Sequence, residues 1–311
     1  MRYAFFNGKI VPFGEAKISI MTHAFNYGTG VFEGVRAYWN AEKEQMYVVK
    51  LREHFERLES SAKLAMRTTL KYSLAELENI TVELARKNDY REDIYIRPLY
   101  YKSQEKIGLG LIGVEEDFCM FCSPFGAYLD ISRGIRVCVS SWWRISGKSA
   151  PQGAKITGSY FNSSLAKAEA LEKGYDEAIL LSHQKTVAEG SGENLYLVKD
   201  GKLTTPPLSE TILPGITRVC IMTLAEKELG IKTVERQIKQ DELYSADELF
   251  FCGTGAQVSP IVEVDGKKIG SGQPGLLTMK LQGLYLSAAR GDNPKYADWV
   301  TPVYPHTKND L

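Results

Sequence analysis

The chain has 311 residues, which is enough for two domains of ordinary size, each with its own hydrophobic core. Hydrophobic residues make up 44% and charged residues 24%, values of globular proteins that argue against a disordered or fibrous chain. Basic and acidic residues balance at 38 each, so no overall charge favours binding to nucleic acid or to an anionic membrane.

The sequence shows no sign of a membrane or secreted protein. It has no uninterrupted run of about 18 apolar residues, the length that spans a bilayer. The chain turns at Asn7-Gly8 before the apolar core of a signal peptide could form. Five cysteines, an odd number without a secretion signal, fit a reducing compartment. We therefore expect a cytoplasmic protein with neither a membrane nor a nucleic acid as its partner.

The N-terminal part is expected to begin with a hairpin and to continue with helices and strands. Apolar residues flank Asn7-Gly8, the kind of pair that two-residue turns with positive φ prefer. Apolar residues at helical spacing predict a helix at 52–67. Ser73 and Glu76 form a capping box that begins a second helix, at 74–87. The strands expected next are at 93–101 and 117–123.

The C-terminal part is richer in strands. A β segment at 134–143 precedes a helix at 160–173, with Gly174 where a C-terminal cap belongs. Further along, strands are joined by short turns such as Asp200-Gly201 and Asp265-Gly266. The remaining expected helices are at 217–229, 241–245 and 276–290.

Strands and helices are mixed without regular alternation, which indicates an α+β fold rather than a doubly wound parallel sheet. The strand at 117–123 ends at Pro124-Phe125-Gly126, which we interpret as the exit from the first domain. The expected domains are 1–127 and 135–311, with an interdomain loop at 128–134.

Three short motifs match known signatures but lack the context that those signatures need. Gly108–Gly113 has the spacing of a dinucleotide-binding loop, yet a strand is expected where that loop requires a helix. Cys119 and Cys122 have the spacing of a redox or zinc pair, but no second pair exists and the four histidines are scattered. Ser191 lacks the first glycine of a nucleophile elbow. We therefore expect a loop, core cysteines, no metal site and no catalytic serine.

Two ionisable residues stand among small neighbours. Lys155 lies between small and apolar residues just ahead of a helix. Burial disfavours the charged form of a lysine, and a neutral amine is what Schiff-base chemistry requires. The alternative is a buried stem whose ammonium reaches solvent. Glu189 lies between small residues and glycines and could approach a ligand closely, or could be a turn acid that faces water.

Two glycine-containing turns are candidates for binding an anion. Residues 213–218 place a glycine turn before a helix, whose first N–H groups and positive dipole end suit a phosphate, although a plain N-cap would look similar. Residues 252–257 give a glycine-threonine turn after an apolar strand. A reactive lysine, a lone carboxylate and two anion sites together point to pyridoxal phosphate, an enzyme cofactor that needs all three.

Longer motifs then make the chain resemble a fold-type IV pyridoxal-phosphate aminotransferase, and most closely the branched-chain amino acid aminotransferases. The motifs run in order along nearly the whole chain, and they are Tyr27–Arg36 (YGTGVFEGVR), Tyr95–Leu99 (YIRPL), Gly126–Leu129 (GAYL) and the segments around Lys155, Glu189, Gly215 and Gly253. The resemblance implies a two-domain α+β fold similar to D-amino acid aminotransferase. In that fold, a small N-terminal α/β domain precedes a larger β-rich pseudo-barrel domain.

The resemblance also implies which residues hold the cofactor. Lys155 is the expected Schiff-base lysine, which moves a proton between the substrate Cα and the cofactor C4′ atom. Glu189 is expected to pair with the protonated ring nitrogen, and Tyr160 to hydrogen-bond the ring O3′. The expected phosphate and ring contacts are Arg57, Ile216, Thr217 and Thr254 for the phosphate and Leu213 for the ring face. Helical periodicity alone places Arg57 off the apolar face and predicts a surface arginine.

For the substrate, the resemblance implies that the backbone N–H groups of Gly255 and Ala256, with Tyr95, bind the α-carboxylate. Arg97 is the expected partner of the second carboxylate of glutamate, and Arg36 is expected to orient Tyr95. An apolar pocket for a branched side chain is expected from Tyr27, Phe32, Tyr128 and Tyr160. One departure is Phe125, where many bacterial members of the family carry tryptophan.

The expected reaction is transfer of the amino group of leucine, isoleucine or valine to 2-oxoglutarate, which gives glutamate and a branched 2-oxo acid. The alternatives within the fold are a D-amino acid transaminase, an (R)-amine transaminase and aminodeoxychorismate lyase. A further alternative is a catalytically inactive relative that acts as a binding module. In the family the loop at 107–113 contributes to a neighbouring subunit, so we expect at least a homodimer.

Overall fold

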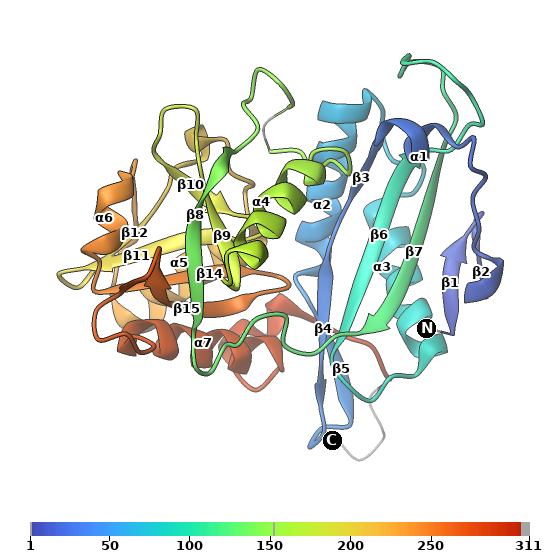
Figure 1. Cartoon of the computed structure of the whole chain (residues 1–311). Helices are drawn as coiled ribbons and strands as arrows, with labels where there is room; N and C mark the ends of the chain where they lie inside the picture. Colours follow the sequence, from blue (N-terminus) through green and yellow to red (C-terminus); the bar gives the residue numbers. More distant parts are fainter. Residues whose placement is uncertain (1, 152, 306–311) are drawn as a thin grey trace. The chain divides into compact units, whose positions relative to one another are not determined.

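The structure is a computed structural model that describes residues 2–151 and 153–305. The described chain divides into two compact units (Figure 1). Unit 1 consists of residues 2–126, 154–158 and 287–305, and unit 2 consists of residues 127–151, 153 and 159–286. The short segment 154–158 therefore packs with residues far from it in the sequence. The domain boundary at 128–134 stays a prediction.

Unit 1 is built on a sheet with the strand order β17-β5-β4-β6-β7-β1-β2, and β3 also pairs with β6. Every named strand pair in this sheet is antiparallel. The strands are β1 (Tyr3–Phe6), β2 (Lys9–Pro12), β3 (Gly30–Phe32), β4 (Val35–Asn40), β5 (Gln45–Val49), β6 (Ile94–Lys102), β7 (Glu116–Pro124) and β17 (Val300–Pro302).

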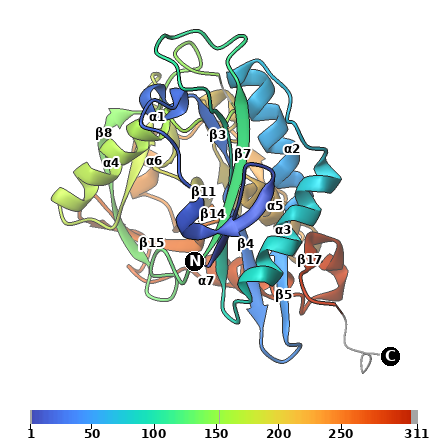
Figure 2. The ribbon, with the colours of Figure 1, turned by 90° about the vertical axis from the view of Figure 1, so that its right-hand side faces the viewer.

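Two long helices cover one face of this sheet (Figures 1 and 2). They are α2 (Leu51–Ser61) and α3 (Leu74–Asn88), and the short helix α1 (His23–Tyr27) precedes β3. Phe55 and Leu58 of α2 and Leu84 of α3 are fully buried with Val35 and Val48 of the sheet. The apolar helix faces therefore form the core of unit 1.

Unit 2 contains a mixed sheet with the order β10-β9-β8-β15-β14-β11-β12-β13, and β16 pairs with β15. The strands are β8 (Ile135–Trp143), β9 (Glu177–Leu181), β10 (Val187–Gly190), β11 (Asn194–Lys199), β12 (Lys202–Thr205), β13 (Val234–Glu235), β14 (Glu248–Gly253), β15 (Gln257–Val264) and β16 (Lys267–Lys268). The pairs β8·β9, β8·β15 and β12·β13 are parallel. This mixture confirms the expected α+β class.

The helices of unit 2 begin and end close to the predicted positions. They are α4 (Tyr160–Glu172), α5 (Ile216–Leu229), α6 (Gln240–Tyr244) and most of α7 (Leu276–Ala289). Helix α4 packs on β8 and β9, and α5 packs on β14. Gly174 follows α4 with a φ of 77°, the left-handed conformation expected of a residue that ends a helix.

The expected helix at 52–67 differs from the structure in its last turn. Helix α2 ends at Ser61, and residues Ala62–Met66 form a π-helical turn. A π turn inserts a residue into the regular hydrogen-bond pattern, and such turns are frequent at functional sites. Here the turn begins directly after Ser61, whose hydroxyl contacts the backbone of Lys155.

Candidate active site

The segment that carries Lys155 lies beside strand β3 in unit 1. The N–H of Phe32 donates to the carbonyl of Lys155 at 3.0 Å, and Val31 forms a β bridge with Ile156. On the other side, the N–H of Lys155 donates to Oγ of Ser61 at 3.0 Å. Backbone bonds from both directions therefore fix the position from which the lysine side chain extends.

The Lys155 side chain is buried. The residue is only 9% exposed, and its ammonium lies 4.9 Å from the centre of the Phe32 ring. A cation over an aromatic face is attracted by the ring quadrupole, and the attraction strengthens when water is excluded. Lys155 is thus set apart from the many lysines of the chain that lie in solvent.

Arg57 is not the surface arginine that helical periodicity predicts. Its side chain is 10% exposed, and its guanidinium binds the buried carboxylate of Glu33 through Nε and Nη2, both at 2.7 Å. His54 Nδ1 lies 2.7 Å from the same carboxylate. Burial raises the pKa of Glu33, but Arg57 and His54 outweigh it and hold that pKa at about 2. Burial lowers the pKa of His54, and because the Glu33 carboxylate can only accept, Nδ1 of His54 is the donor in this contact.

Three more of the predicted substrate residues lie together in unit 1. Arg97 Nη2 donates to the Tyr95 hydroxyl at 3.0 Å, and the guanidinium lies 4.5 Å from the centre of the Phe32 ring. A Cβ at position 34 would lie 1.9 Å from the Tyr95 hydroxyl oxygen, so any larger residue there would displace the Tyr95 side chain. The motif around Phe32 therefore leaves room for Tyr95.

Arg36 and Tyr27 also belong to unit 1. Arg36 Nη2 donates to the carbonyls of Phe125 at 3.0 Å and Gly126 at 2.7 Å, which ties strand β4 to the end of β7. The Tyr27 hydroxyl accepts a hydrogen bond from the N–H of Gly108 at 3.1 Å. The glycine-rich segment after β6 is thus a loop followed by strand β7, as predicted, and not the start of a helix.

In unit 2, Glu189 is 5% exposed and lies on β10 at a shift in the register with β9. Its Oε1 accepts a hydrogen bond from Arg144 Nε at 2.6 Å. Its Oε2 accepts from Asn194 Nδ2 and from the N–H of Leu213, both at 3.1 Å. A β-bulge re-aims a side chain, and the donors then fix this carboxylate in one orientation.

Asn194 links Glu189 to the turn before α5. It donates to the carbonyl of Leu213 at 3.0 Å, and its Oδ1 lies only 1.9 Å from where a Cβ at Gly215 would be. Helix α5 then begins at Ile216 and Thr217, and within the described residues no side chain caps its first turn. Uncapped N–H groups at a helix N-terminus suit a phosphate, and a glycine at this turn keeps the approach open.

The other predicted residues of unit 2 lie on turns and helix ends. Thr254, Gly255 and Ala256 form the turn between β14 and β15, and Tyr160 is the first residue of α4. Tyr128 is 46% exposed, and the Lys167 ammonium lies 5.4 Å from the centre of its ring.

A buried pair of acids adjoins this region of unit 2. Glu177 is fully buried and forms an ion pair with the Lys167 ammonium at 2.9 Å. The second acid, Glu193, is 5% exposed. Burial and the charge of Glu177 raise the pKa of Glu193 to about 8. Both effects favour the protonated form of Glu193.

The structure thus divides the predicted site residues between the units. Those of unit 1 are Tyr27, Phe32, Arg36, Arg57, Tyr95, Arg97 and Lys155. Those of unit 2 are Tyr128, Tyr160, Glu189, Leu213, Ile216, Thr217, Thr254, Gly255 and Ala256.

Sequence reasoning missed the residues that hold these side chains in place. Arg144 and Asn194 bind Glu189, and Glu33 binds Arg57. Arg144 follows the last residue of a strand and has no motif of its own. For Glu33 and Asn194 a signal was available, because both lie inside motifs that carry predicted residues.

The described part of the chain contains neither a metal-binding cluster nor a membrane-spanning helix. Among residues 2–151 and 153–305, no group of three or more His, Cys, Asp or Glu is arranged to hold a metal ion. The helices within the same ranges are too short or too polar to cross a membrane. Cys119 and Cys122 lie within β7, and burial raises the pKa of each thiol to about 12, which agrees with core packing.

Comparisons with known proteins give one consistent result. The Amino-transferase class IV family matches residues 30–264. The probable branched-chain-amino-acid aminotransferase of Aquifex aeolicus is 52% identical over 304 residues, which cover 98% of this chain and 97% of that protein.

Solved structures give the same picture. The branched-chain aminotransferase of Thermoproteus uzoniensis, solved with norvaline, has a TM-score of 0.93 and 44% identity, and the match covers 97% of this chain and 99% of the other. The branched-chain amino acid aminotransferase of Thermobaculum terrenum, solved in its PLP-form, has a TM-score of 0.93 and 36% identity, with 98% and 99% covered.

The chain belongs to the class IV aminotransferases and, within them, to the branched-chain amino acid aminotransferase family. It is a pyridoxal-phosphate enzyme whose substrates are amino acids and 2-oxo acids. The residues present fit this cofactor, since a buried lysine, a carboxylate held by donors and an uncapped helix start behind a required glycine are all in place. The alternatives within the fold are not favoured by these matches.

Proposed function

We propose that this protein transfers the amino group of branched-chain L-amino acids to 2-oxoglutarate, which yields glutamate and branched 2-oxo acids. The observation that carries the reaction is Lys155, an amine that is 9% exposed and lies over the Phe32 ring. The substrate class is supported by relatives that are named for it and that match the chain over nearly its full length.

Each proposed role at the cofactor belongs to a residue of this chain. Pyridoxal phosphate, when bound, supplies a ring that accepts the electrons of the substrate Cα–H bond. Lys155 Nζ would carry the proton between the substrate Cα and the cofactor C4′ atom. Glu189 holds the proton on the ring nitrogen, and its three donors keep the carboxylate available for this. Tyr160 would hydrogen-bond O3′ and Leu213 would pack on the ring.

The phosphate is proposed to bind to Arg57, to the N–H groups of Ile216 and Thr217, and to Thr254. Glu33 fixes the orientation of the Arg57 guanidinium, so that arginine is pre-organised before an anion arrives. An uncapped helix start contributes further donors and the positive end of the dipole.

The substrate is proposed to bind through two kinds of contact. Gly255, Ala256 and Tyr95 bind the α-carboxylate, and Arg97 binds the second carboxylate of glutamate. The hydrogen bond from Arg97 to Tyr95 supports a shared carboxylate-binding role for these two residues. Arg36 supports them by donating to the carbonyls of Phe125 and Gly126. The apolar pocket is proposed to consist of Tyr27, Phe32, Tyr128 and Tyr160.

We also propose a cytoplasmic homodimer. Several large apolar side chains of unit 1 are exposed around α1 and the loop before β7, and they are Ile20 (81%), Phe25 (67%), Ile107 (67%), Leu109 (80%) and Ile112 (86%). Large apolar side chains exposed near one another in sequence and structure are typical of an interaction surface. The occupant proposed here is a second copy of this chain, and sedimentation would test it.

The experiment is a substrate panel on purified protein supplied with pyridoxal phosphate. L-leucine with 2-oxoglutarate should yield glutamate, whereas D-alanine and (R)-1-phenylethylamine should serve as poor donors. Lys155→Ala should abolish turnover while its melting temperature stays near that of the parent. A protein that stays colourless with the cofactor, or that makes no glutamate from leucine, would refute the proposal.

A further inference from the structure

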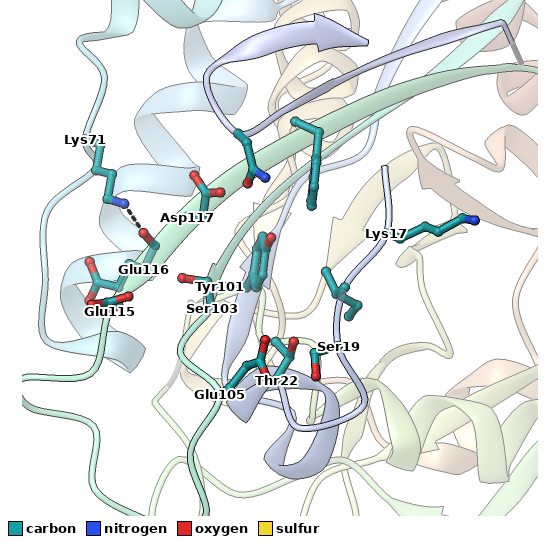
Figure 3. A pocket seen from close by; sticks show the side chains of 13 residues that line it. Lys17, Ser19, Thr22, Lys71, Tyr101, Ser103, Glu105, Glu115, Glu116 and Asp117 are labelled. Atoms are coloured by element: carbon teal, nitrogen blue, oxygen red, sulfur yellow. Dashed lines mark hydrogen bonds between the residues drawn. The ribbon is translucent and has the colours of Figure 1, made fainter. Parts of the chain in front are cut away.

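Unit 1 contains a pocket that none of the proposed active-site residues line (Figure 3). Its volume is about 600 Å³, and it lies between the N-terminal hairpin, the segment 17–22 and the adjoining ends of β6 and β7. A space of this size accommodates a small organic molecule.

The strand register explains which side chains line the pocket. Tyr101 of β6 is paired with Asp117 of β7, so both side chains lie on the same face of the sheet. Ser103, Glu105 and Glu115 lie just beyond the ends of these strands and also line the pocket. Figure 3 shows the Tyr101 side chain between Asp117 and Glu105.

The Tyr101 hydroxyl can form a hydrogen bond with a ligand in the pocket. Tyr101 is 7% exposed and lines the pocket. In the part of the chain that the structure describes, its hydroxyl makes no hydrogen bond. The ring is therefore largely buried while its hydroxyl is open to the pocket, where a water molecule or a ligand can bind it.

The charge in the pocket is also unbalanced. Within residues 2–151 and 153–305, the carboxylates of Glu105, Glu115 and Asp117 form no ion pair. Of the two lysines that line the pocket, Lys71 donates to the backbone carbonyl of Glu116, and Figure 3 shows the Lys17 ammonium turned away. A cation is therefore the complementary ligand.

The arrangement of the carboxylates favours an extended organic cation over a metal ion. Among the described residues these acids do not form a group that could hold a metal. Instead they lie on both sides of the Tyr101 ring, and Phe6 and Ile18 add apolar surface. We propose that this pocket binds a linear aliphatic diammonium compound. One ammonium binds Asp117 and the Tyr101 hydroxyl, the other binds Glu105, and the alkyl chain lies along the tyrosine ring.

The test is isothermal titration calorimetry with 1,4-diaminobutane in phosphate buffer at 0.15 M salt. The protein is loaded with pyridoxamine phosphate, which has no aldehyde, so the added amine cannot condense with the cofactor. We expect saturable binding of the diamine, weaker binding of 1-aminobutane and no binding of butane-1,4-diol.

Variants locate the binding. Asp117→Asn and Tyr101→Phe should each weaken diamine binding by about tenfold, the usual effect of losing a hydrogen bond to a charged group. Glu83→Gln removes one exposed carboxylate on α3 and should leave binding unchanged. Melting temperatures of the three variants in the absence of ligand report whether each has folded.

Three outcomes would overturn the proposal. They are the absence of saturable binding, equal weakening by Asp117→Asn and Glu83→Gln, and equal affinity for the diamine and the diol. None of these outcomes bears on transamination, so the proposed function and this proposal fail separately.

Discussion

Phe32 contacts Lys155 twice, through its backbone and through its ring. Its N–H donates to the Lys155 carbonyl at 3.0 Å, and its ring centre lies 4.9 Å from the ammonium of the same residue. One residue thus positions the lysine backbone and also stabilises the charged end of the side chain. The two functions can be separated, because a substitution removes the ring and keeps the N–H.

Phe32→Leu should slow the reaction without unfolding the protein. The backbone bond remains, while the ring contact with the Lys155 side chain and one apolar wall of the proposed substrate pocket are lost. Because part of that pocket is missing, we expect kcat/KM for leucine to fall by about tenfold, a change of about 1.4 kcal/mol, and the apoprotein to regain its cofactor absorption band more slowly. Phe13→Leu, at a half-buried ring that contacts Phe121, is the matched control. Unchanged rates in Phe32→Leu would contradict the role of the ring.

Arg144→Met should weaken cofactor binding. Methionine keeps much of the apolar stem but leaves the buried Glu189 carboxylate without its charged partner, a loss of about 3 kcal/mol. Fluorescence titration of the apoprotein should show at least about a tenfold rise in the Kd for pyridoxal phosphate. Arg136→Met removes a more exposed ion pair with Glu263 in the same unit and should bind the cofactor normally. Equal Kd values for the two variants would sink the prediction.

Gly215→Ala should disturb the turn before α5. Its Cβ would meet Asn194 Oδ1 at 1.9 Å, and Asn194 would lose its bonds to Glu189 and Leu213. We expect a lower melting temperature, which corresponds to a loss of about 1–3 kcal/mol in the free energy of unfolding, and weaker cofactor binding. In Gly283→Ala, inside α7, the new Cβ would lie in open space, and we expect the helix to be stabilised by about 1 kcal/mol. Thermal melts of both variants, with and without cofactor, check this.

Glu193→Gln should stabilise the protein increasingly as pH rises. The pKa of Glu193 is raised from 4.5 to about 8, so between these values the unfolded chain releases a proton that the folded chain keeps. Glu193 therefore lowers the stability of the folded parent across this pH window. In the variant, position 193 does not titrate and makes no such contribution. The melting temperature of Glu193→Gln minus that of the parent should grow by several degrees between about pH 5.5 and pH 8.5. Glu83→Gln supplies the reference, and parallel curves for the parent and Glu193→Gln would contradict the prediction.

Features that depend on neighbouring residues were predictable from the sequence. Asn7 and Gly8 have φ values of 51° and 77°, as the expected hairpin turn requires, and Ser73 and Glu76 form both bonds of the predicted capping box. A buried Cys122 and a strand after Gly108–Gly113 were also predicted correctly, whereas Cys119 is only partly buried. Each of these depends on residue types within a few positions.

Features that depend on distant partners were not predictable. Arg57 lies off the apolar stripe of α2, as its periodicity indicates, but the carboxylate of Glu33, 24 positions away, buries it. Arg144 and Glu189 are 45 positions apart in the sequence. The π turn follows Ser61, whose hydroxyl accepts from the N–H of Lys155, 94 positions further along the chain. Periodicity describes one element and contains no information about which other element supplies a charge.

The chain returns at 154–158 to a strand that it left more than a hundred positions earlier, and this constrains how the protein can be divided. A fragment that stops at Gly126 has strand β3 and Ser61 but lacks the amine. The complementary fragment has the amine but none of the backbone partners that hold it. A split version of this enzyme would therefore regain activity only when its pieces reassociate, which makes turnover a reporter of fragment complementation.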